Sequence, residues 1–168
     1  MMREKHNHLS VQCAIITVSD TRNKETDKSG QRIREMLNHA RHHVNAYKIL
    51  QDEKEEIYEH VKDMTMDNKV EAIIINGGTG ISYRDVTIEA IQPLFDKELP
   101  GFGEIFRYLS YEYDIGSPSI LSRAACGIAN HRVVFSLPGS TGAVNLAMER
   151  LILPELGHIV KELKKDIT

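Results

Sequence analysis

The sequence predicts an α/β domain of three layers (α/β/α), in which helices cover both faces of a mainly parallel β-sheet that includes a short antiparallel hairpin. Short β-branched runs alternate with segments of helical periodicity along the 168 residues. One of these runs, residues 70–76, is almost continuously apolar, as is typical of a strand buried on both faces of a parallel sheet. The chain shows no internal repeat and no linker, so we expect residues 1–168 to form a single domain with a flexible tail at 1–9.

The N-terminal half is expected to contain strands at 11–18, 44–50 and 70–76, separated by helices at 29–40 and 53–66. Each helix carries apolar residues at helical spacing, so each has one face to bury against the sheet. These stripes consist of Ile33, Met36 and Leu37 in the first helix and of Ile57, Val61 and Met64 in the second. The order of the elements favours parallel pairing, because each helix returns the chain to the same end of the sheet.

The segment after the third strand is expected to be helical at 86–95, with an interruption near Pro93, and again at 101–113. Two β-rich runs follow, at 123–130 and 131–138, and their junction at Asn130 and His131 predicts an antiparallel hairpin.

The C-terminal segment is expected to form two helices, at 143–156 and 157–165. Pro154 and Gly157 lie where the first would end and the second begin, and both residues disfavour a helix interior.

The overall charge excludes some classes of function. The formal net charge is −3 and the isoelectric point is about 6.2, so the chain lacks the basic balance of proteins that wrap nucleic acid. No stretch approaches the roughly 20 consecutive apolar residues of a membrane-spanning helix. The N-terminal MMREKHNHLS also lacks the apolar core of a signal peptide. We therefore expect a soluble cytoplasmic protein that binds neither nucleic acid nor membrane.

The cysteines and histidines offer no clear metal site. Cys13 and Cys126 both lie in apolar runs without a second cysteine at metal-ligand spacing, which favours reduced thiols in the core. His6 and His8 lie in the N-terminal tail, and His42–His43 precede a strand. Metal binding and a solvated or capping role are both open for these histidines, and the second is the more common.

Three expected strands end in polar or glycine-rich sequence: SDTR at 19–22, NGGTG at 76–80 and PGSTG at 138–142. In open α/β sheets ligands bind beyond the carboxyl ends of the strands, so these stretches are expected to meet at one crevice. Glycines let backbone N–H groups approach an anion closely, and the helices that follow add a favourable dipole. The alternative is that each loop is a turn that needs glycine only for its backbone conformation.

Two well-known phosphate loops do not match. Gly80 is followed by Ile81 and Ser82, so the lysine and hydroxyl of a GxxxxGK[ST] loop are missing, and the GxGxxG spacing is not met either.

Asp85 follows the glycine loop instead. A carboxylate beside phosphate is repulsive unless a cation lies between them, so Asp85 is a candidate Mg²⁺ ligand or hydroxyl-orienting group. It is equally a candidate N-cap for a helix that begins at Val86, and one side chain can fill both roles.

Four stretches carry a family resemblance: NGGTGISYRDVTIEA, PGFGEIFR, SILSRAACGI and LPGSTGAV. In this order they closely resemble the MoaB/MogA family of molybdenum cofactor biosynthesis, and its MoaB branch most of all. The resemblance spans nearly the whole chain. It implies the molybdopterin-binding domain fold and the adenylylation of molybdopterin by ATP with Mg²⁺, which releases pyrophosphate. The adenylylated product is the form into which a partner enzyme inserts the metal.

The resemblance also implies roles for individual residues. Asp52 and Asp85 match the family's functional aspartates, with Mg²⁺ as their expected metal. Asn76 departs from the pattern, because many members carry Thr there. Structural ion pairing or a solvated position is an equal alternative for Glu104 and Arg123. The implied substrate- and nucleotide-binding residues are Ser19, Asp20, Gly77, Gly78, Thr79, Gly80, Glu104, Ser122, Arg123, Pro138, Gly139 and Ser140.

Family resemblance further implies a homo-oligomer, either a trimer or a hexamer built as a dimer of trimers. The apolar residues Phe102, Phe106 and Leu109 are candidates for a subunit interface as well as for the core. Two other functions stay open: a family member that binds molybdopterin without adenylylating it, and an oligomeric scaffold for other enzymes of molybdenum cofactor biosynthesis. The scaffold is disfavoured because it would not need the glycine loops.

Overall fold

The computed structural model describes residues 8–167, which contain a six-stranded sheet of order β2–β1–β3–β6–β5–β4. Strands β2, β1, β3 and β6 are parallel, whereas β5 runs antiparallel to β6 and β4 antiparallel to β5. The predicted fold class is therefore confirmed. The strands are β1 (Gln12–Val18), β2 (His43–Leu50), β3 (Ala72–Asn76), β4 (Lys97–Glu98), β5 (Ala125–Ala129) and β6 (Arg132–Leu137).

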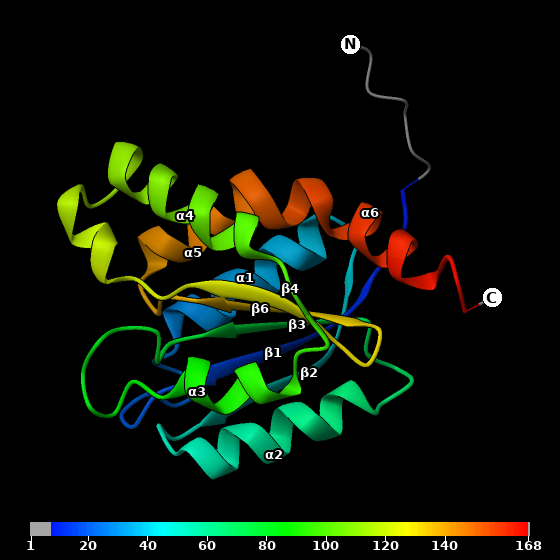
Figure 1. Cartoon of the computed structure of the whole chain (residues 1–168), viewed down its shortest axis with the longest axis horizontal. Helices are drawn as coiled ribbons and strands as arrows, with labels where there is room; N and C mark the ends of the chain where they lie inside the picture. The colour runs from blue at the N-terminus through cyan, green and yellow to red at the C-terminus, as the bar shows by residue number, and fades with distance from the viewer. Residues whose placement is uncertain (1–7, 168) are drawn as a thin grey trace.

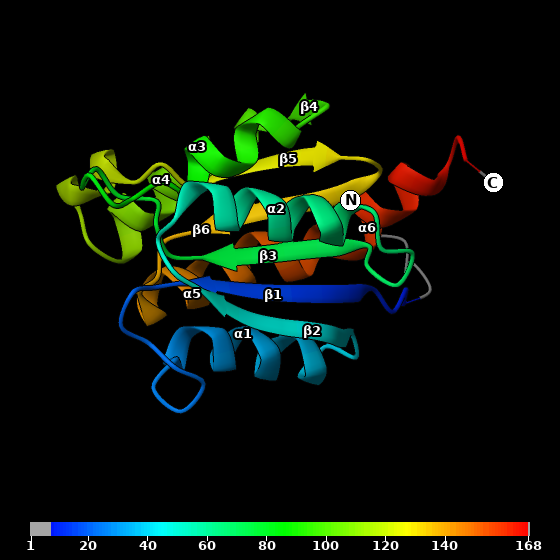
Figure 2. The same ribbon diagram turned by 90° about the horizontal axis from the view of Figure 1, so that it is seen from below.

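Helices cover both faces of this sheet (Figure 1). One face packs against α1 (Lys28–His39), α4 (Pro100–Tyr113), α5 (Thr141–Ala147) and α6 (Leu153–Lys164). The other face packs against α2 (Lys54–Thr65) and α3 (Thr87–Ile91), which lie in front of the strands in Figure 2. The short 3₁₀ helices are η1 (Gln92–Leu94) and η2 (Ser117–Leu121), and a π-helical turn, η3 (Met148–Ile152), joins α5 to α6.

The core has two halves because side chains alternate across each strand. In β1, Ile15 points to the face covered by α1, α4, α5 and α6, and Ile16 points to the face covered by α2 and α3. Both side chains are fully buried. Every residue of β3 is buried, as the apolar run at 70–76 predicted. The predicted helical stripes of α1 and α2 are buried as well. Cys13 and Cys126 are buried free thiols, and burial raises the pKa of both.

The predicted hairpin is also confirmed. Strands β5 and β6 are joined at Asn130 and His131, whose φ angles of 46° and 64° are those of a tight two-residue turn. The very short edge strand β4 and the helix η2 were not expected from the sequence, since two and five residues carry too little periodicity to detect.

The predicted break between two C-terminal helices is wrong. The chain stays helical from α5 through η3 into α6, and Gly157 lies inside α6. Pro154 lies in the first turn of α6, directly after the wide turn in which the N–H of Leu153 bonds to the carbonyl of Met148. A π-helical turn widens the helix where the proline ring would otherwise press on the preceding turn. The helix therefore changes its hydrogen-bond register at Pro154 instead of ending.

Of the histidines that the sequence left open, His42 has a structural role. His42 is buried, and its Nδ1 accepts a hydrogen bond from the backbone of Val11 at 3.1 Å. Burial, with a smaller effect of the neighbouring His8, holds the pKa of His42 below its ordinary value. The predicted tail at 1–9 and His6 fall largely or wholly on residues 1–7, which lie outside the described part of the chain.

Candidate functional site

Three neighbouring parallel strands place the three polar stretches side by side. Strands β1, β3 and β6 are adjacent in the sheet, so their carboxyl ends lie at one edge. The N–H of Gly77 donates to the carbonyl of Leu137 at 2.9 Å, which joins the second stretch to the third. The Cα of Gly77 also lies only 3.4 Å from where a Cβ on Gly139 would be. The structure thus brings SDTR, NGGTG and PGSTG together.

The glycines of residues 77–80 are required by close packing. Gly77 and Gly78 have φ angles of 98° and 70°, which favour glycine. A Cβ on Gly77 would lie 2.2 Å from the carbonyl oxygen of Val18, and one on Gly78 would lie 2.1 Å from Oγ1 of Thr87. Thr87 fixes the loop by donating from Oγ1 to the carbonyl of Gly77 at 2.9 Å. Gly77 and Gly78 are therefore both needed for the backbone conformation of this loop and for its close packing.

Both candidate catalytic carboxylates border this loop. Oδ1 of Asp52 lies 3.5 Å from the Cβ position of Gly78, and Oδ2 of Asp85 lies 2.7 Å from that of Gly80. Partial burial, followed by the negative charges of Asp20 and Asp85, raises the pKa of Asp52 above its ordinary value. Three carboxylates from three different loops therefore act on one another electrostatically.

Asp85 does not cap the following helix, so that alternative from the sequence is wrong. Helix α3 begins at Thr87, its N-cap is Val86, and no side chain caps it. Asp85 instead closes a turn: its Oδ2 accepts from the N–H of Ser82 at 3.0 Å, and its own N–H donates to the carbonyl of Ser82. This turn holds the carboxylate beside Gly80.

Arg123 has a structural role that the sequence left open. Its Nε donates to the carbonyl of Gly80 and its Nη2 to the carbonyl of Asp85, each at 2.9 Å. Its guanidinium also forms an ion pair with Glu89, which lowers the pKa of that carboxyl. Its backbone N–H bonds to the carbonyl of Thr79 at 3.0 Å. Arg123 therefore fixes the glycine loop and the backbone at Asp85 from the side.

Glu104 and Ser122 lie in a cavity of about 370 Å³ between α3, η1 and α4. Arg123 lines the same cavity and so connects it to the glycine loop. Glu104 is exposed and forms no ion pair within the described residues. Arg107 lines the wall and donates to the carbonyl of Ala124 at 3.0 Å.

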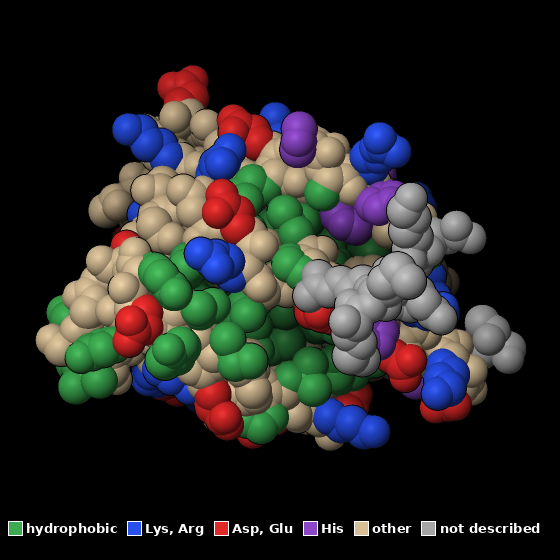
Figure 3. Space-filling view, turned by 90° about the horizontal axis from the view of Figure 1, so that it is seen from above, with side chains coloured by type: hydrophobic (Ala, Val, Ile, Leu, Met, Phe, Trp, Pro, Cys, Tyr) green, Lys and Arg blue, Asp and Glu red, His purple; other side chains and the backbone are tan. Residues whose placement is uncertain are grey.

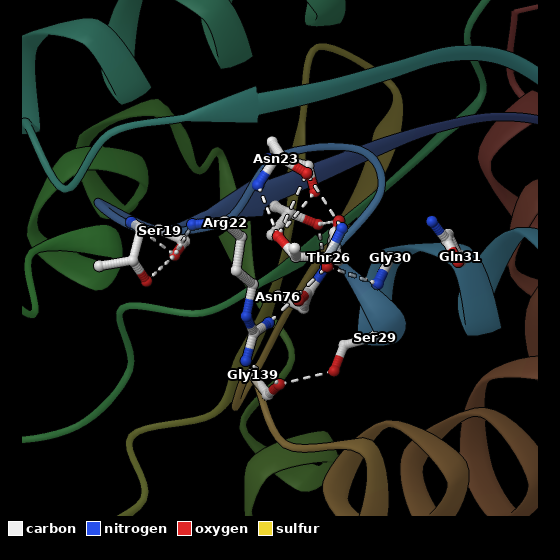
Figure 4. Close-up of polar contacts among 12 residues, drawn as sticks. Ser19, Arg22, Asn23, Thr26, Ser29, Gly30, Gln31, Asn76 and Gly139 are labelled. Atoms are coloured by element: carbon white, nitrogen blue, oxygen red, sulfur yellow. Dashed lines mark hydrogen bonds and ion pairs between the residues drawn. The ribbon is translucent and has the colours of Figure 1, made fainter.

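The PGSTG stretch is held by a helix cap and by hydrogen bonds from the loop after β1 and from α1. Ser140 is the N-cap of α5 and accepts from the N–H of Ala143 at 3.2 Å. The carbonyl of Gly139 accepts two hydrogen bonds, from Oγ of Ser29 at 2.6 Å and from Nη2 of Arg22 at 3.0 Å (Figure 4). Pro138 precedes this pinned peptide and is partly buried.

In the SDTR stretch, the side chains of Ser19 and Asp20 accept hydrogen bonds from backbone N–H groups. Oγ of Ser19 accepts from the N–H of Arg22 at 3.1 Å and so shapes the loop. Oδ1 of Asp20 accepts from the N–H of Asp52 at 3.0 Å, which links the loop after β1 to the loop after β2.

Sequence reasoning missed a buried polar network behind the site. Asp27, the N-cap of α1, is fully buried and accepts from Oγ1 of Thr17 at 2.6 Å and from the hydroxyl of Tyr47. Asn76 donates to the same Thr17 at 2.8 Å and so ties the end of β3 to β1. The cap spacing of Asp27 and Gly30 could have been found in the sequence, whereas the pairing with Tyr47 could not.

Arg84 is a second residue that the sequence analysis did not assign. Its guanidinium donates to both carboxylate oxygens of Asp20, at 2.6 and 3.1 Å, and to Glu53 at 2.9 Å. Arg84 therefore holds the loop after Gly80 across the front of the loops after β1 and β2.

Within residues 8–167, no group of three or more His, Cys, Asp or Glu side chains is arranged to hold a metal ion. None of the described helices has the length and apolarity to cross a membrane.

Known proteins resemble this chain over most of its length. Residues 14–158 match the family model described as "Probable molybdopterin binding domain". The chain is 59% identical to "Molybdenum cofactor biosynthesis protein B" of Bacillus subtilis (strain 168) over 156 residues, which cover 93% of this chain and 92% of that protein.

Two solved structures show the same similarity. A crystal structure of molybdenum cofactor biosynthesis protein B is 53% identical with a TM-score of 0.93, covering 96% of this chain and 100% of that one. The tungsten cofactor synthesizing protein MoaB from Pyrococcus furiosus is 40% identical with a TM-score of 0.82, covering 94% and 99%.

Proposed function

Because the chain belongs to the MoaB family of molybdenum cofactor biosynthesis proteins, we propose that it binds molybdopterin and adenylylates it with Mg-ATP, releasing pyrophosphate. The observation that carries the proposal is the position of Asp52 and Asp85, both beside the glycine loop at the meeting point of three strand ends. A non-catalytic molybdopterin-binding protein would not need two carboxylates there. The proposal also implies a cytoplasmic location, where ATP is available.

Adenylyl transfer requires two anions to be held together. A phosphate oxygen of molybdopterin attacks the α-phosphorus of ATP, the bond from that phosphorus to the β-phosphate oxygen breaks, and pyrophosphate leaves. The chain contributes positioning and electrostatics. Backbone N–H groups of residues 78–80 and 139–141 would donate to phosphate, since the N–H of Gly77 is bonded to the carbonyl of Leu137 and Pro138 has none. Arg123 keeps Gly80 and Asp85 in place during the reaction.

The carboxylates fit a Mg²⁺ ion that enters with ATP. Mg²⁺ prefers oxygen ligands and is usually held by one or two carboxylates together with substrate phosphates and water, so a site of three protein ligands is not required. Partial burial and, after it, repulsion from Asp20 and Asp85 raise the pKa of Asp52, and a divalent cation would relieve that repulsion. Asp52 and Asp85 would hold the ion, which would neutralise charge on the pyrophosphate leaving group.

The test is turnover. Purified protein is incubated with molybdopterin, ATP and Mg²⁺, and adenylylated molybdopterin and pyrophosphate are measured by mass spectrometry and a coupled phosphate assay. We expect both products in equal amounts, and neither product when Mg²⁺ is replaced by EDTA. Tight molybdopterin binding without product would instead identify a non-catalytic member of the family. Absence of binding to either substrate would favour a scaffold for other cofactor enzymes.

We also propose a homo-oligomer, with a partly revised interface. Phe106 is fully buried in the core of the chain itself and cannot contact another subunit, whereas Phe102 and Leu109 are partly buried. Hydrophobic side chains gather on the outside of the layer that contains α4, α5 and α6 (Figure 3). The exposed large hydrophobic residues on and after α4 are Ile105, Tyr108, Tyr111, Tyr113, Ile115, Ile120 and Leu121.

A further inference from the structure

Arg22 reaches from the loop after β1 to the PGSTG stretch (Figure 4). Its Nη2 donates to the carbonyl of Gly139 at 3.0 Å, and its Nη1 lies 3.7 Å from Oδ1 of Asp27. One third of the Arg22 side chain, 33%, is exposed, while the side chain of Asp27 is completely buried. The guanidinium therefore lies beside a buried carboxylate, while part of the Arg22 side chain stays exposed to solvent.

Asp27 does not use up the hydrogen-bonding capacity of Arg22. Its Oδ1 accepts from the N–H of Gly30 at 3.0 Å, and its Oδ2 accepts from Thr17 and Tyr47. Three neutral donors therefore solvate this carboxylate, and Arg22 lies beyond hydrogen-bond distance from it. A guanidinium has five N–H donors. Among the described residues, the bond to Gly139 is the only hydrogen bond that the guanidinium donates.

Gly139 leaves the guanidinium without a neighbouring side chain at that position. A Cβ on Gly139 would lie 3.5 Å from Nη1 of Arg22, 3.6 Å from its Nη2 and 3.4 Å from the Cα of Gly77. Any larger side chain at position 139 would extend between the guanidinium and the NGGTG loop. The Arg22 donors therefore border the junction of the two glycine-containing stretches.

Holding the Gly139 carbonyl does not by itself explain an arginine at position 22. Oγ of Ser29 already donates to that carbonyl at 2.6 Å. A second, charged donor adds a positive charge and a planar array of N–H groups, which matches phosphate geometry.

We infer that Arg22 binds a phosphate group of a substrate at the junction of the NGGTG and PGSTG stretches, with buried Asp27 fixing the orientation of the guanidinium. This inference deepens the proposed function and rests on it for the nature of the substrates. The phosphate belongs either to ATP or to the phosphate monoester of molybdopterin, since the same chemistry recognises both.

Two matched variants separate charge from loop position. Arg22→Gln keeps a side-chain N–H that can bond to Gly139 but removes the charge, and Ser29→Ala removes the other donor to Gly139 while leaving Arg22 in place. Calorimetry with ATP, with molybdopterin and with inorganic pyrophosphate gives the affinities, without any need for turnover. Circular dichroism and thermal unfolding verify that both variants fold. Arg22→Lys retains a positive charge and supplies a third comparison, and Arg22→Met, which also removes the charge, takes the place of Arg22→Gln if that variant does not fold.

We expect Arg22→Gln to weaken binding of one substrate by about 10-fold or more, as for a lost charge-assisted hydrogen bond, and Ser29→Ala to weaken it by less than about 3-fold. Arg22→Lys should lie between Arg22→Gln and the wild type. Loss confined to ATP and pyrophosphate assigns the phosphate to the nucleotide, and loss confined to molybdopterin assigns it to the pterin.

Equal losses in Arg22→Gln and Ser29→Ala would overturn the inference, because Arg22 would then only position the loop. Unchanged affinities in Arg22→Gln, or in Arg22→Met tested in its place, would overturn it as well. These outcomes are distinct from failure of the proposed function: a protein that binds both substrates through Arg22 but yields no adenylylated product would refute the reaction and leave the Arg22 site intact.

Discussion

Nε of Arg84 lies 2.6 Å from Oδ2 of Asp20, in an ion pair that joins the loop after β3 to the loop after β1. The hydrogen bonds from Arg84, followed by the one from the N–H of Asp52, hold the pKa of Asp20 below its ordinary value. Because Asp52 and Asp85 flank the same loops, this pair places a positive charge beside a group of carboxylates.

Replacing Arg84 by Gln should raise the pKa of Asp20 toward that of a free aspartate. Asp20 has a lowered pKa in the folded protein, so its pairing stabilises the fold above the ordinary aspartate pKa and is lost as pH falls through the folded value. The titration of the Asp20 carboxyl carbon by NMR measures this directly. Arg150→Gln, which removes an arginine that stacks on Tyr113, is the control. An Asp20 pKa that stays the same in Arg84→Gln would contradict the role of the pair.

Replacing Asp52 by Asn should stabilise the protein slightly at pH 7. The raised pKa of Asp52 means that its ionised form is disfavoured in the folded state. Its stabilising contribution is therefore present only below the unfolded pKa and is lost as pH rises through the folded value. Asn removes this cost at neutral pH while the backbone bond to Asp20 remains.

Urea unfolding of the wild type and Asp52→Asn at pH 7 and at pH 3.5 or so tests this expectation. The variant should be the more stable at pH 7, by less than about 1 kcal/mol because the group is partly solvated, and the difference should shrink in acid. In parallel, ATP affinity should depend on Mg²⁺ in the wild type and much less in the variant. A destabilised Asp52→Asn at pH 7 would show that the carboxylate is paired favourably in the folded state.

Replacing Asp85 by Asn should separate catalysis from folding. Asn can still accept the hydrogen bond from Ser82, so the turn should persist, but the charge that would hold a cation is lost. We expect turnover to fall by about 10²-fold or more, as when a preorganised electrostatic contact is removed. Molybdopterin affinity should change little.

Asp85→Ala additionally loses the turn hydrogen bond and should cost about 1 kcal/mol of unfolding free energy. The adenylylation rate, pterin affinity and unfolding midpoint of both variants are measured side by side. Normal turnover in Asp85→Asn together with early melting of Asp85→Ala would show that the carboxylate only closes the turn.

Replacing Gly77 by Ala should be strongly destabilising. Its φ of 98° is unfavourable for alanine, and the added Cβ would lie 2.2 Å from the carbonyl oxygen of Val18. We expect a loss of about 3 kcal/mol, measured by chemical unfolding. Gly101→Ala is the matched control, because Gly101 lies in α4 with nothing within 4 Å of its Cβ position. That change should stabilise by about 0.5–1 kcal/mol. Equal effects at the two positions would argue against the tight packing of the glycine loop.

The protein should sediment and scatter light as a trimer or hexamer at micromolar concentration. Seven large apolar side chains are exposed on and after α4, large exposed apolar patches mark interaction surfaces, and closed homo-oligomers are common among soluble proteins. Tyr108→Lys, at an exposed position of α4, should shift the population toward the monomer, whereas Lys62→Glu on α2, on the opposite face of the sheet, should not. A wild-type monomer would refute the assembly and leave the site unaffected.

The sequence determined the succession of the main strands and helices along the chain, the hairpin at Asn130–His131 and the glycine loop at 77–80. These features depend on local properties: the periodicity of apolar residues, positive φ angles and short-range turn chemistry. The C-terminal break was predicted wrongly from Pro154, because packing of one long helix against the sheet outweighs a proline that a π-turn can accommodate.

The tertiary structure alone decided which side chains share the site. Arg84 reaches Asp20 across 64 positions of sequence, Arg22 reaches Gly139 across 117, and Arg123 reaches Gly80 across 43. No local pattern encodes such pairs, since they arise only when parallel strands bring distant loops to one edge of the sheet. Asp85 was assigned wrongly for a different reason: its spacing suited a helix cap, but its carboxylate accepts from the N–H of Ser82, three positions earlier, and so closes a local turn beside Gly80.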